Sequence, residues 1–297
     1  MKFVYSDGYT ADLMEHVFPI EKYKLIYQKL RDEGVLTDEN HIVPQMADWD
    51  DVALVHTNEY IDDMRNLRQT MRTAWSEMAL TSDIIDAFRL GTGGTIEAMR
   101  WAVRGYGSAN IGGGLHHAFP DHAEGFCYIN DIGVGIRVVQ KDGFTGKILI
   151  VDCDLHQGNG TAVIFQDDPG VFTFSIHQEN NYPVKQKSDY DIGLRDMCGD
   201  DEYLQLLKKS LDEILTQFIP NIVVYVAGAD PYIDDQLGGL ALTADGLAKR
   251  DELIISTASK LNVPIVILLA GGYAHLIDDT VEIQANTLRI GNKYYRD

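Results

Sequence analysis

Short apolar runs alternate with stretches of helical periodicity along most of the chain. The apolar runs predict six β-strands, which are Lys2–Tyr5, Ser108–Ile111, Ile148–Val151, Val171–Ile176, Ile222–Val226 and Pro264–Leu269. The periodic stretches predict helices at Pro19–Glu33, Ser82–Arg104, Asp131–Lys141, Asp200–Phe218 and Thr243–Lys260, and a further helix from Leu276. Strands that alternate with helices are typical of βαβ units. The pattern therefore predicts an α/β fold around a parallel sheet.

Five of the predicted strands run directly into polar or glycine-rich segments. In chain order these segments are GGGLHHAF, DCDLHQGNG, the single residue His177, AGADP and AGGY. Ligand sites in open parallel sheets lie beyond the carboxyl ends of the strands. We therefore expect the five segments to converge on one site.

Three residues in these segments have the chemistry of a catalytic metal site. Asp154 and His156 stand at i and i+2 after a buried strand, and Asp230 follows another strand. One imidazole and two carboxylates would leave a position open for water or substrate, whereas structural zinc sites are normally closed. This ligand set fits Zn²⁺ and also Fe²⁺, Co²⁺ or Mn²⁺.

The adjacent His116 and His117 are suited to proton transfer near neutral pH. The alternative is that one of the pair is a hydrogen-bonded core histidine. Asp152 and Asn159 lie close to the metal candidates and can orient the two rings. An aspartate partner raises a histidine's affinity for protons, whereas an amide orients the ring without adding charge. The two histidines are therefore expected to differ in role.

Tyr273 follows Gly271 and Gly272 and can donate its phenol to an oxyanion opposite the metal. The alternative is a tyrosine packed at a turn. Together with the metal and the histidines, this donor would complete a metal-dependent amide hydrolase, in which a histidine takes the proton of water and later protonates the departing amine.

Composition narrows the classes of protein and partner. The 297 residues are 45% hydrophobic and 24% charged, without a linker or repeat, so a single domain spanning 1–297 is expected. No signal peptide is evident, and the longest apolar run, Val263 to Ala270, is too short to span a membrane, so we expect a cytoplasmic protein. The net charge of −20 argues against nucleic acid as a partner. It favours a cationic substrate such as a lysine-rich peptide or a polyamine, unless it serves solubility alone.

The three cysteines predict no disulfide framework and no metal knuckle. Cys127, Cys153 and Cys198 are irregularly spaced. Cys153 lies between two acids of the metal segment, so its side chain is expected to point to the opposite side and pack.

Five ordered motifs carry a resemblance to a known family. GGGLHHAF, GFCYIND, DCDLHQGNG, AGADPYIDDQLGG and AGGY fall between about Phe18 and Tyr273, and they resemble the histone deacetylase superfamily of zinc-dependent deacylases. In its HQGNG motif and its lack of long insertions, the chain is most similar to class IV and its bacterial relatives. The resemblance implies a single-domain, arginase-like α/β fold with an eight-stranded parallel sheet and helices on both faces.

The resemblance also implies residue roles. Zinc would be held by Asp154, His156 and Asp230, with Fe²⁺ or Co²⁺ as other possible metals. The implied catalytic residues are His116, His117 as the general base, Asp152 behind His116, Asn159 behind His117, and Tyr273 as transition-state donor. Class I members carry aspartate where this chain has Asn159, so His117 is expected to be a weaker base when free.

Further positions implied by the resemblance concern the substrate tunnel and a second cation. Gly125, Phe126 and Gly271 would line the tunnel, and Tyr182 is a candidate for its opposite wall. The family's potassium site would use Asp152, Asp154, His156, Ser175 and Ile176. The rim aspartate of class I members has no clear counterpart around Glu77–Asp83.

The leading hypothesis is a zinc-dependent lysine deacylase that removes an acetyl group or a longer fatty acyl group from a protein or peptide. Acetylpolyamine hydrolysis, with a small acylated amine as substrate, is the nearby alternative. An arginase-type dimetal enzyme is rejected. Such an enzyme should carry a second set of carboxylates, of the DxDxxDP kind, whereas AGADP has only one acid at that point. A catalytically silent acyl-lysine binding module is the alternative from another class. The oligomeric state is not indicated.

Overall fold

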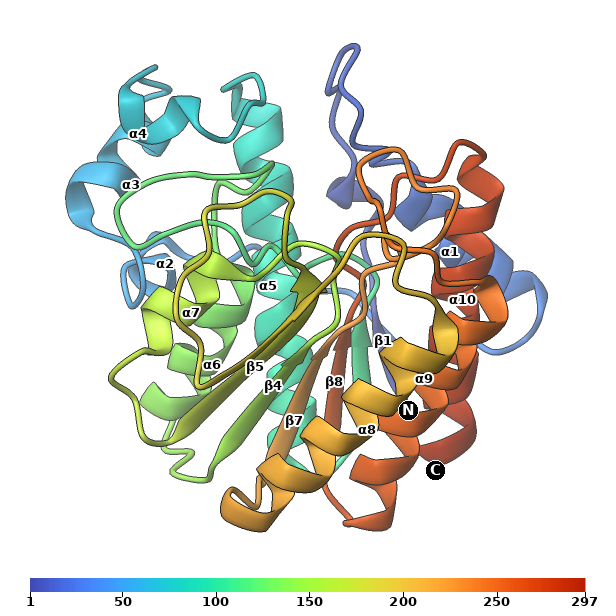
Figure 1. Cartoon of the computed structure of the whole chain (residues 1–297). Helices are drawn as coiled ribbons and strands as arrows, with labels where there is room; N and C mark the ends of the chain where they lie inside the picture. The colour runs from blue at the N-terminus through green and yellow to red at the C-terminus, as the bar shows by residue number, and fades with distance from the viewer. Residues whose placement is uncertain (297) are drawn as a thin grey trace.

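The computed structural model describes residues 1–296 and is built around one eight-stranded sheet. All neighbouring strands pair in parallel, in the order β2-β1-β3-β8-β7-β4-β5-β6 (Figure 1). The strands are β1 Lys2–Val4, β2 His41–Ile42, β3 Ser108–Asn110, β4 Ile148–Asp152, β5 Val171–Gln178, β6 Tyr190–Leu194, β7 Ile222–Val226 and β8 Ile265–Leu268. The α/β class and the eight parallel strands are therefore confirmed.

Helices cover both faces of the sheet (Figure 1). In chain order they are the 3₁₀ helix η1 Asp7–Tyr9, α1 Lys22–Asp32, α2 Trp49–Val52, α3 Asn58–Arg65, α4 Met71–Ala74, α5 Ser82–Val103, α6 Asp131–Lys141, α7 Asn159–Phe165, α8 Asp200–Gln217, α9 Ala244–Lys260 and α10 Ile277–Tyr294. The layer of α5, α6 and α7 lies on one face, and the layer of α1, α8, α9 and α10 lies on the other.

Alternating side chains of the strands supply the two halves of the core. Ile148 and Ile150 of β4 pack toward α5 and α6, whereas Leu149 and Val151 pack toward α8 and α9. The whole of β4 is buried, as expected for a parallel strand covered on both faces. This burial explains why the central strands read as continuous apolar runs.

The structure corrects two details of the sequence-based strands. β2 and β6 lie at the two edges of the sheet and were not among the six strands predicted from apolar runs. β5 continues to Gln178, so His177 lies inside a strand and not after it. The cause is β6, which pairs with β5 over this stretch and places Gly193 opposite His177.

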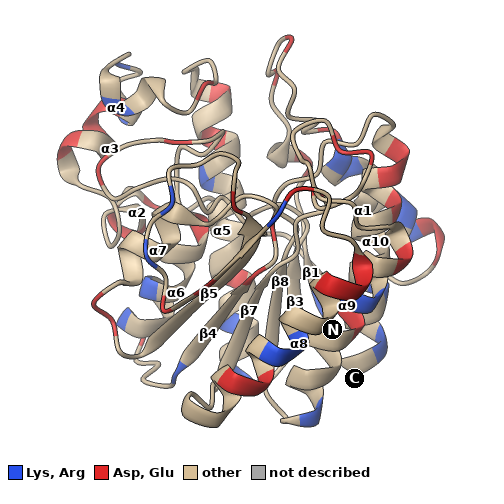
Figure 2. Cartoon of the chain, in the orientation of Figure 1, with Lys and Arg blue, Asp and Glu red and all other residues tan. Residues whose placement is uncertain are grey.

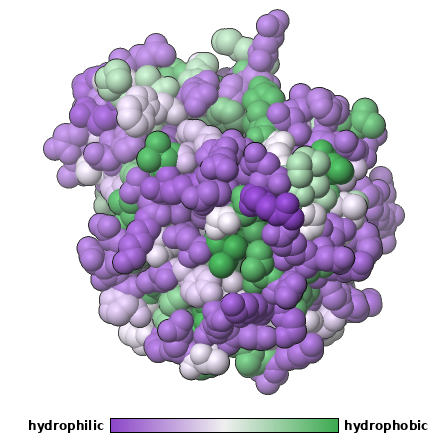
Figure 3. Space-filling view, in the orientation of Figure 1, coloured by the Kyte–Doolittle hydropathy of each residue, from purple (hydrophilic) through white to green (hydrophobic). Residues whose placement is uncertain are grey.

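Charge and hydropathy follow the layered arrangement. Lys, Arg, Asp and Glu lie mainly on helices and loops, and the central strands carry few of them (Figure 2). The face seen in Figure 3 is mostly hydrophilic, with scattered hydrophobic patches. Within residues 1–296, no helix combines the length and the apolarity that crossing a membrane would require.

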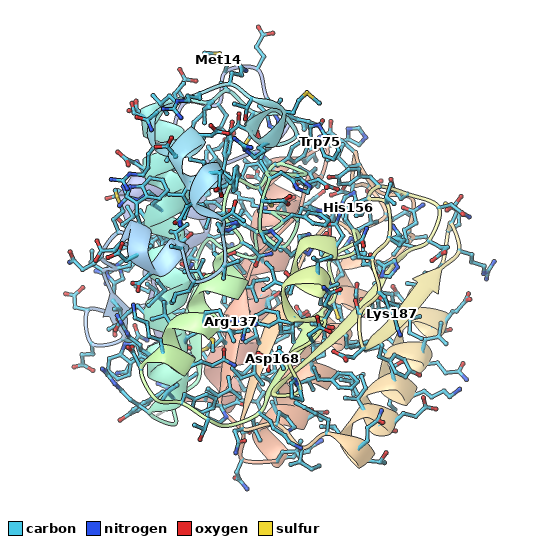
Figure 4. All side chains as sticks on the ribbon, turned by 90° about the vertical axis from the view of Figure 1, so that its left-hand side faces the viewer. Met14, Trp75, Arg137, His156, Asp168 and Lys187 are labelled. Atoms are coloured by element: carbon cyan, nitrogen blue, oxygen red, sulfur yellow. The ribbon has the colours of Figure 1, made fainter. Side chains whose placement is uncertain are left out.

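Parallel pairing brings the carboxyl ends of all strands to one edge of the sheet, where long loops gather at the top of Figure 1. His156 lies at this level, and the loops with Trp75 and Met14 lie beyond it (Figure 4). The fold thus places the predicted site segments on one side of the molecule.

Candidate active site

Asp154, His156 and Asp230 form a buried cluster beyond the ends of β4 and β7. One potential ligand atom from each residue lies within 4.8 Å of the others. His156 Nδ1 is 3.3 Å from Asp154 Oδ1 and 3.2 Å from Asp230 Oδ2. The three predicted metal ligands therefore meet in one place, with oxygen and nitrogen donors that suit a divalent metal.

The cluster is electrostatically unfavourable without a positive charge at its centre. Burial raises the pKa of Asp230, and the nearby Asp154 carboxylate raises it further. Burial alone would lower the pKa of His156, but the carboxylates of Asp154 and Asp230 raise it to about 10. The site thus holds positive charge strongly, whether as a proton on His156 or as a metal ion.

Backbone amides fix the two carboxylates in place. Gly271 N–H donates to Asp154 Oδ2 at 2.8 Å, and Leu155 N–H donates to Asp230 Oδ1 at 2.9 Å. A side chain at Gly271 would collide with both carboxylates, so glycine is required for this close approach. The loop after β8 therefore belongs to the metal cluster as well as to the cavity.

The two histidines that follow β3 have different partners. His116 Nδ1 lies 2.7 Å from Asp152 Oδ2, and His117 Nδ1 lies 2.8 Å from Asn159 Oδ1. Their rings are 4.1 Å apart between centroids. Asn159 is the first residue of α7, and it stands seven residues after Asp152, the last residue of β4.

The environments of the two rings separate the proton affinities of the pair. Burial alone would lower the pKa of His116, but the carboxylates of Asp152 and Asp154 raise it to about 9. Burial lowers the pKa of His117 well below its usual value, and the neighbouring His116 and His156 lower it further. In the metal-free protein at neutral pH, His116 therefore carries a proton while His117 keeps a free nitrogen.

Tyr273 lies on the lining of the same cavity as the two histidines. Its ring packs edge-on against Phe18 and Phe126, with centroids 6.0 and 6.1 Å away. Burial raises the pKa of its phenol, and the Asp230 and Asp154 carboxylates raise it further. The phenol thus remains a hydrogen-bond donor throughout the physiological pH range.

Most of these side chains line one cavity of about 270 Å³, whereas Asp152, Asn159 and Asp230 are not on its lining. Its lining includes the predicted site residues His116, His117, Gly125, Phe126, Asp154, His156, Tyr182, Gly271 and Tyr273. Tyr182 packs against His117, with ring centroids 5.3 Å apart, and so does form a wall of the cavity. Glu77 also lines the cavity. It belongs to the segment Glu77–Asp83, in which the sequence indicated no clear counterpart of the rim aspartate.

The family model for the histone deacetylase domain matches residues 16–288. The chain belongs to the histone deacetylase family. It is 39% identical over 292 residues to an uncharacterized protein of Picosynechococcus sp., with 94% of each chain covered. It is 29% identical to histone deacetylase 2 of Arabidopsis thaliana, covering 94% of this chain and 77% of that protein.

One further relative and two solved structures are also similar to this chain. The acetoin utilization protein AcuC of Bacillus subtilis is 29% identical, over 81% of this chain and 69% of that protein. A histone deacetylase homologue crystallised with SAHA superposes with a TM-score of 0.85 at 23% identity, covering 98% of this chain and 84% of that one. A homologue from Aquifex aeolicus gives 0.81 at 23% identity, with 99% and 83% covered. The fold is thus that of the histone deacetylase family.

Sequence reasoning missed the residues that hold the histidine loop of this histone deacetylase fold. Asp131 accepts hydrogen bonds from Leu115 N–H at 2.7 Å and Gly114 N–H at 3.1 Å. Asn130 donates to the carbonyls of His116 and Ala118. Both residues belong to GFCYIND, so that motif was a signal, although nothing in it indicated which loop these side chains would bind.

Of the residues assigned to a potassium site by the family resemblance, Asp152 lies on β4, Ser175 and Ile176 lie on β5, and Asp154 and His156 lie in the loop after β4. Asp152 pairs with Ser175 in register, and Ile176 follows on the same strand. Asp152 Oδ1 accepts from Asp154 N–H at 3.1 Å, so this set directly adjoins the metal cluster.

Cys153 lies between the two acids and is buried away from the cavity lining. Its carbonyl accepts a hydrogen bond from Arg250, on the side of α9. This placement agrees with the packing role expected from the sequence.

Proposed function

We propose that the chain hydrolyses the amide bond of an acyl-lysine side chain. The observation that carries the proposal is the arrangement of the 270 Å³ cavity, which has three metal-ligand candidates, a histidine pair and a buried phenol on its lining or directly beside it. Membership of the histone deacetylase family supports the same reaction class.

The donor set fits a resident divalent metal. Asp154, His156 and Asp230 would hold it, with Zn²⁺ as the proposed ion and Fe²⁺ or Co²⁺ as alternatives. A metal there would polarise the substrate carbonyl and lower the pKa of water. We further propose K⁺ as a structural cation beside Asp152, Asp154, His156, Ser175 and Ile176, because two of these residues are buried carboxylates.

The histidines and Tyr273 would perform the proton transfers. His117 has a free Nε2 when its Nδ1 hydrogen is bonded to Asn159, so it can take a proton from the attacking water. His116, held by Asp152, would keep positive charge beside the developing oxyanion and can supply a proton to the leaving amine. The Tyr273 phenol, which lies on the lining of the same cavity, would donate to the oxyanion.

The proposed substrate is an acyl-lysine in a protein or peptide. The apolar walls formed by Phe126 and Tyr182 suit the methylene chain of lysine, and the net charge of −20 favours a basic peptide. A small acylated amine, such as an acetylpolyamine, is the second candidate, since the same charge would attract it.

A substrate panel tests this function. Protein stripped with a chelator and reloaded with Zn²⁺, Fe²⁺ or Co²⁺ would be incubated with peptides carrying acetyl, octanoyl or myristoyl lysine and with acetylspermidine. Mass spectrometry should show metal-dependent release of acid from a lysine peptide. Release from acetylspermidine alone would establish the second candidate. Peptide binding without turnover by any metal form would instead identify a silent binding module and overturn the proposal.

A further inference from the structure

Glu124 lies directly behind the pair formed by His117 and Asn159. Its carboxylate oxygen Oε1 accepts a hydrogen bond from Asn159 Nδ2 at 2.8 Å and another from the Tyr182 hydroxyl at 3.1 Å. The Glu124 side chain is 13% exposed, and its contact with Asn159 is partly buried, whereas the contact with Tyr182 is exposed. A continuous chain of hydrogen bonds thus runs from Glu124 through Asn159 to the ring of His117.

The carboxylate decides which way the Asn159 amide faces. The amide oxygen and nitrogen have almost the same shape, so packing alone barely distinguishes the two orientations. An ionised carboxylate only accepts hydrogen bonds, and an amide NH₂ only donates them. The NH₂ group of Asn159 must therefore face Glu124, which leaves Oδ1 facing His117.

The orientation of the amide in turn decides the tautomer of His117. Asn159 Oδ1 is an acceptor, so the nitrogen 2.8 Å away, Nδ1, has to carry the hydrogen of the neutral ring. The other nitrogen, Nε2, is then left with its lone pair. With the amide reversed, Nδ1 would accept from NH₂, Nε2 would carry the hydrogen, and His117 could not take a proton.

We propose that Glu124 is a positioning residue that locks the Asn159 amide, and through it holds His117 in the tautomer with a free Nε2. The kinetic part of this inference rests on the proposed function, because it assumes that His117 is the general base. The tautomer itself does not depend on any substrate.

The same contact accounts for asparagine at position 159. An aspartate there would bring a second carboxylate to hydrogen-bonding distance of Glu124, where two ionised carboxylates repel each other. Asparagine and Glu124 together present His117 with an oriented neutral acceptor that has a charge behind it. The residues at 124 and 159 are therefore a matched pair.

The first test is the ring tautomer of His117, observed by NMR on the zinc-loaded protein with ¹⁵N-labelled histidine at pH 7.5. The loss of one signal set in His117→Gln identifies His117 among the nine histidines. We expect the Nδ1–H form in wild type and a shift toward Nε2–H in Glu124→Leu. Glu124→Gln keeps an acceptor oxygen and should restore the wild-type form.

Two control variants separate the inference from simpler explanations. Tyr182→Phe removes only the second hydrogen bond to Glu124, so it should leave the tautomer of His117 unchanged. Glu59→Leu removes an exposed glutamate of α3 and should alter neither the spectrum nor turnover. A shift of the tautomer in Tyr182→Phe would place the effect in the cavity wall and contradict the inference.

The second test is a double-mutant cycle in turnover. Glu124→Leu should lower kcat about tenfold, the value of a hydrogen bond to a charged group, with a smaller change in KM. Asn159→Asp alone should also lower kcat, because it faces the Glu124 carboxylate. Adding Glu124→Gln to Asn159→Asp should recover kcat, since the new amide can donate to the new carboxylate.

The outcomes distinguish this inference from the proposed function. An unchanged His117 tautomer in Glu124→Leu, or a double variant less active than Asn159→Asp alone, would overturn the role of Glu124. If wild type hydrolyses no substrate of the panel, the proposed function fails, and the NMR comparison still decides whether Glu124 orients the amide.

Discussion

Two histidines that are adjacent in sequence occupy opposite electrostatic environments in this protein. His116 faces the Asp152 carboxylate, and His117 faces the Asn159 amide, although the ring centroids are only 4.1 Å apart. One charged partner and one neutral partner let the pair hold one proton and keep one free nitrogen at the same pH. The carboxylates of Asp152 and Asp154 raise the pKa of His116, whereas burial and the two neighbouring histidines lower that of His117.

Tyr273 allows the transition-state part of the mechanism to be tested at a single atom. Tyr273→Phe removes the phenol oxygen and keeps the ring that packs against Phe18 and Phe126. We expect kcat to fall ~100-fold or more, as when one oxyanion donor is lost, with metal content unchanged. Steady-state kinetics on the best peptide of the panel, with metal analysis, measures this.

The matched control is Tyr27→Phe, which removes a phenol from α1 at a half-buried position away from the cavity lining. It should retain wild-type turnover. A Tyr273→Phe enzyme as active as this control would show that the phenol does not act in the reaction.

At the scale of elements, α9 joins the two loops that carry the metal-ligand candidates. Arg250 of α9 is fully buried, and its Nη1 donates to the carbonyls of Cys153 at 3.2 Å and Gly228 at 2.6 Å. Its Nε donates to Asp251 Oδ1 at 2.9 Å. The helix thereby holds the ends of β4 and β7 at a fixed separation.

Replacing Arg250 should therefore destabilise the protein strongly. Arg250→Met would leave the buried Asp251 without its cation, which costs ~3–5 kcal/mol of unfolding free energy. Urea unfolding followed by circular dichroism measures the change. The control Arg100→Met breaks an exposed pair with Asp142 and should cost less than about 1 kcal/mol. Equal losses in the two variants would contradict the role assigned to α9.

How much of the fold could be predicted differs between the centre and the edges of the sheet. β4 and β7 are buried on both faces and appear in the sequence as apolar runs. β2 has two residues, and β6 alternates half-buried and exposed positions in YDIGL before the buried Leu194, so neither has such a run. Hydrophobic patterning therefore identifies strands only where both faces are covered.

The site residues that could be predicted are likewise those that follow apolar runs. Asp154, His156, Asp230 and Tyr273 could be predicted because each stands just after an apolar strand. Glu124 lies in an irregular loop, and its role depends on contacts with two residues distant in sequence. Local patterns contain no information about such contacts, because they arise only when the loops have packed.

At the scale of the whole molecule, a buried histidine links stability to pH. His56 sits between two segments of the site region: its Nδ1–H donates to Phe119 O at 2.9 Å, and its Nε2 accepts from Asn130 N–H at 3.1 Å. Protonation would place a hydrogen on Nε2 against that N–H group. Burial accordingly lowers the pKa of His56 to about 4.

The sign of the pH dependence follows from this shift. Between about pH 4 and 6.5 the unfolded chain protonates this histidine and the folded chain does not, so stability falls as the pH drops through that window. We expect His56 to remove ~2 kcal/mol from the free energy of unfolding at pH 5 relative to pH 8. Urea unfolding of wild type and His56→Gln at both pH values isolates this contribution, because the other titrating groups and the pH dependence of metal binding are common to the two proteins. The stability advantage of wild type over His56→Gln should shrink by that amount at pH 5. A stability difference that is the same at both pH values would contradict the prediction, because it would show that the protonation of His56 does not differ between the folded and unfolded chains.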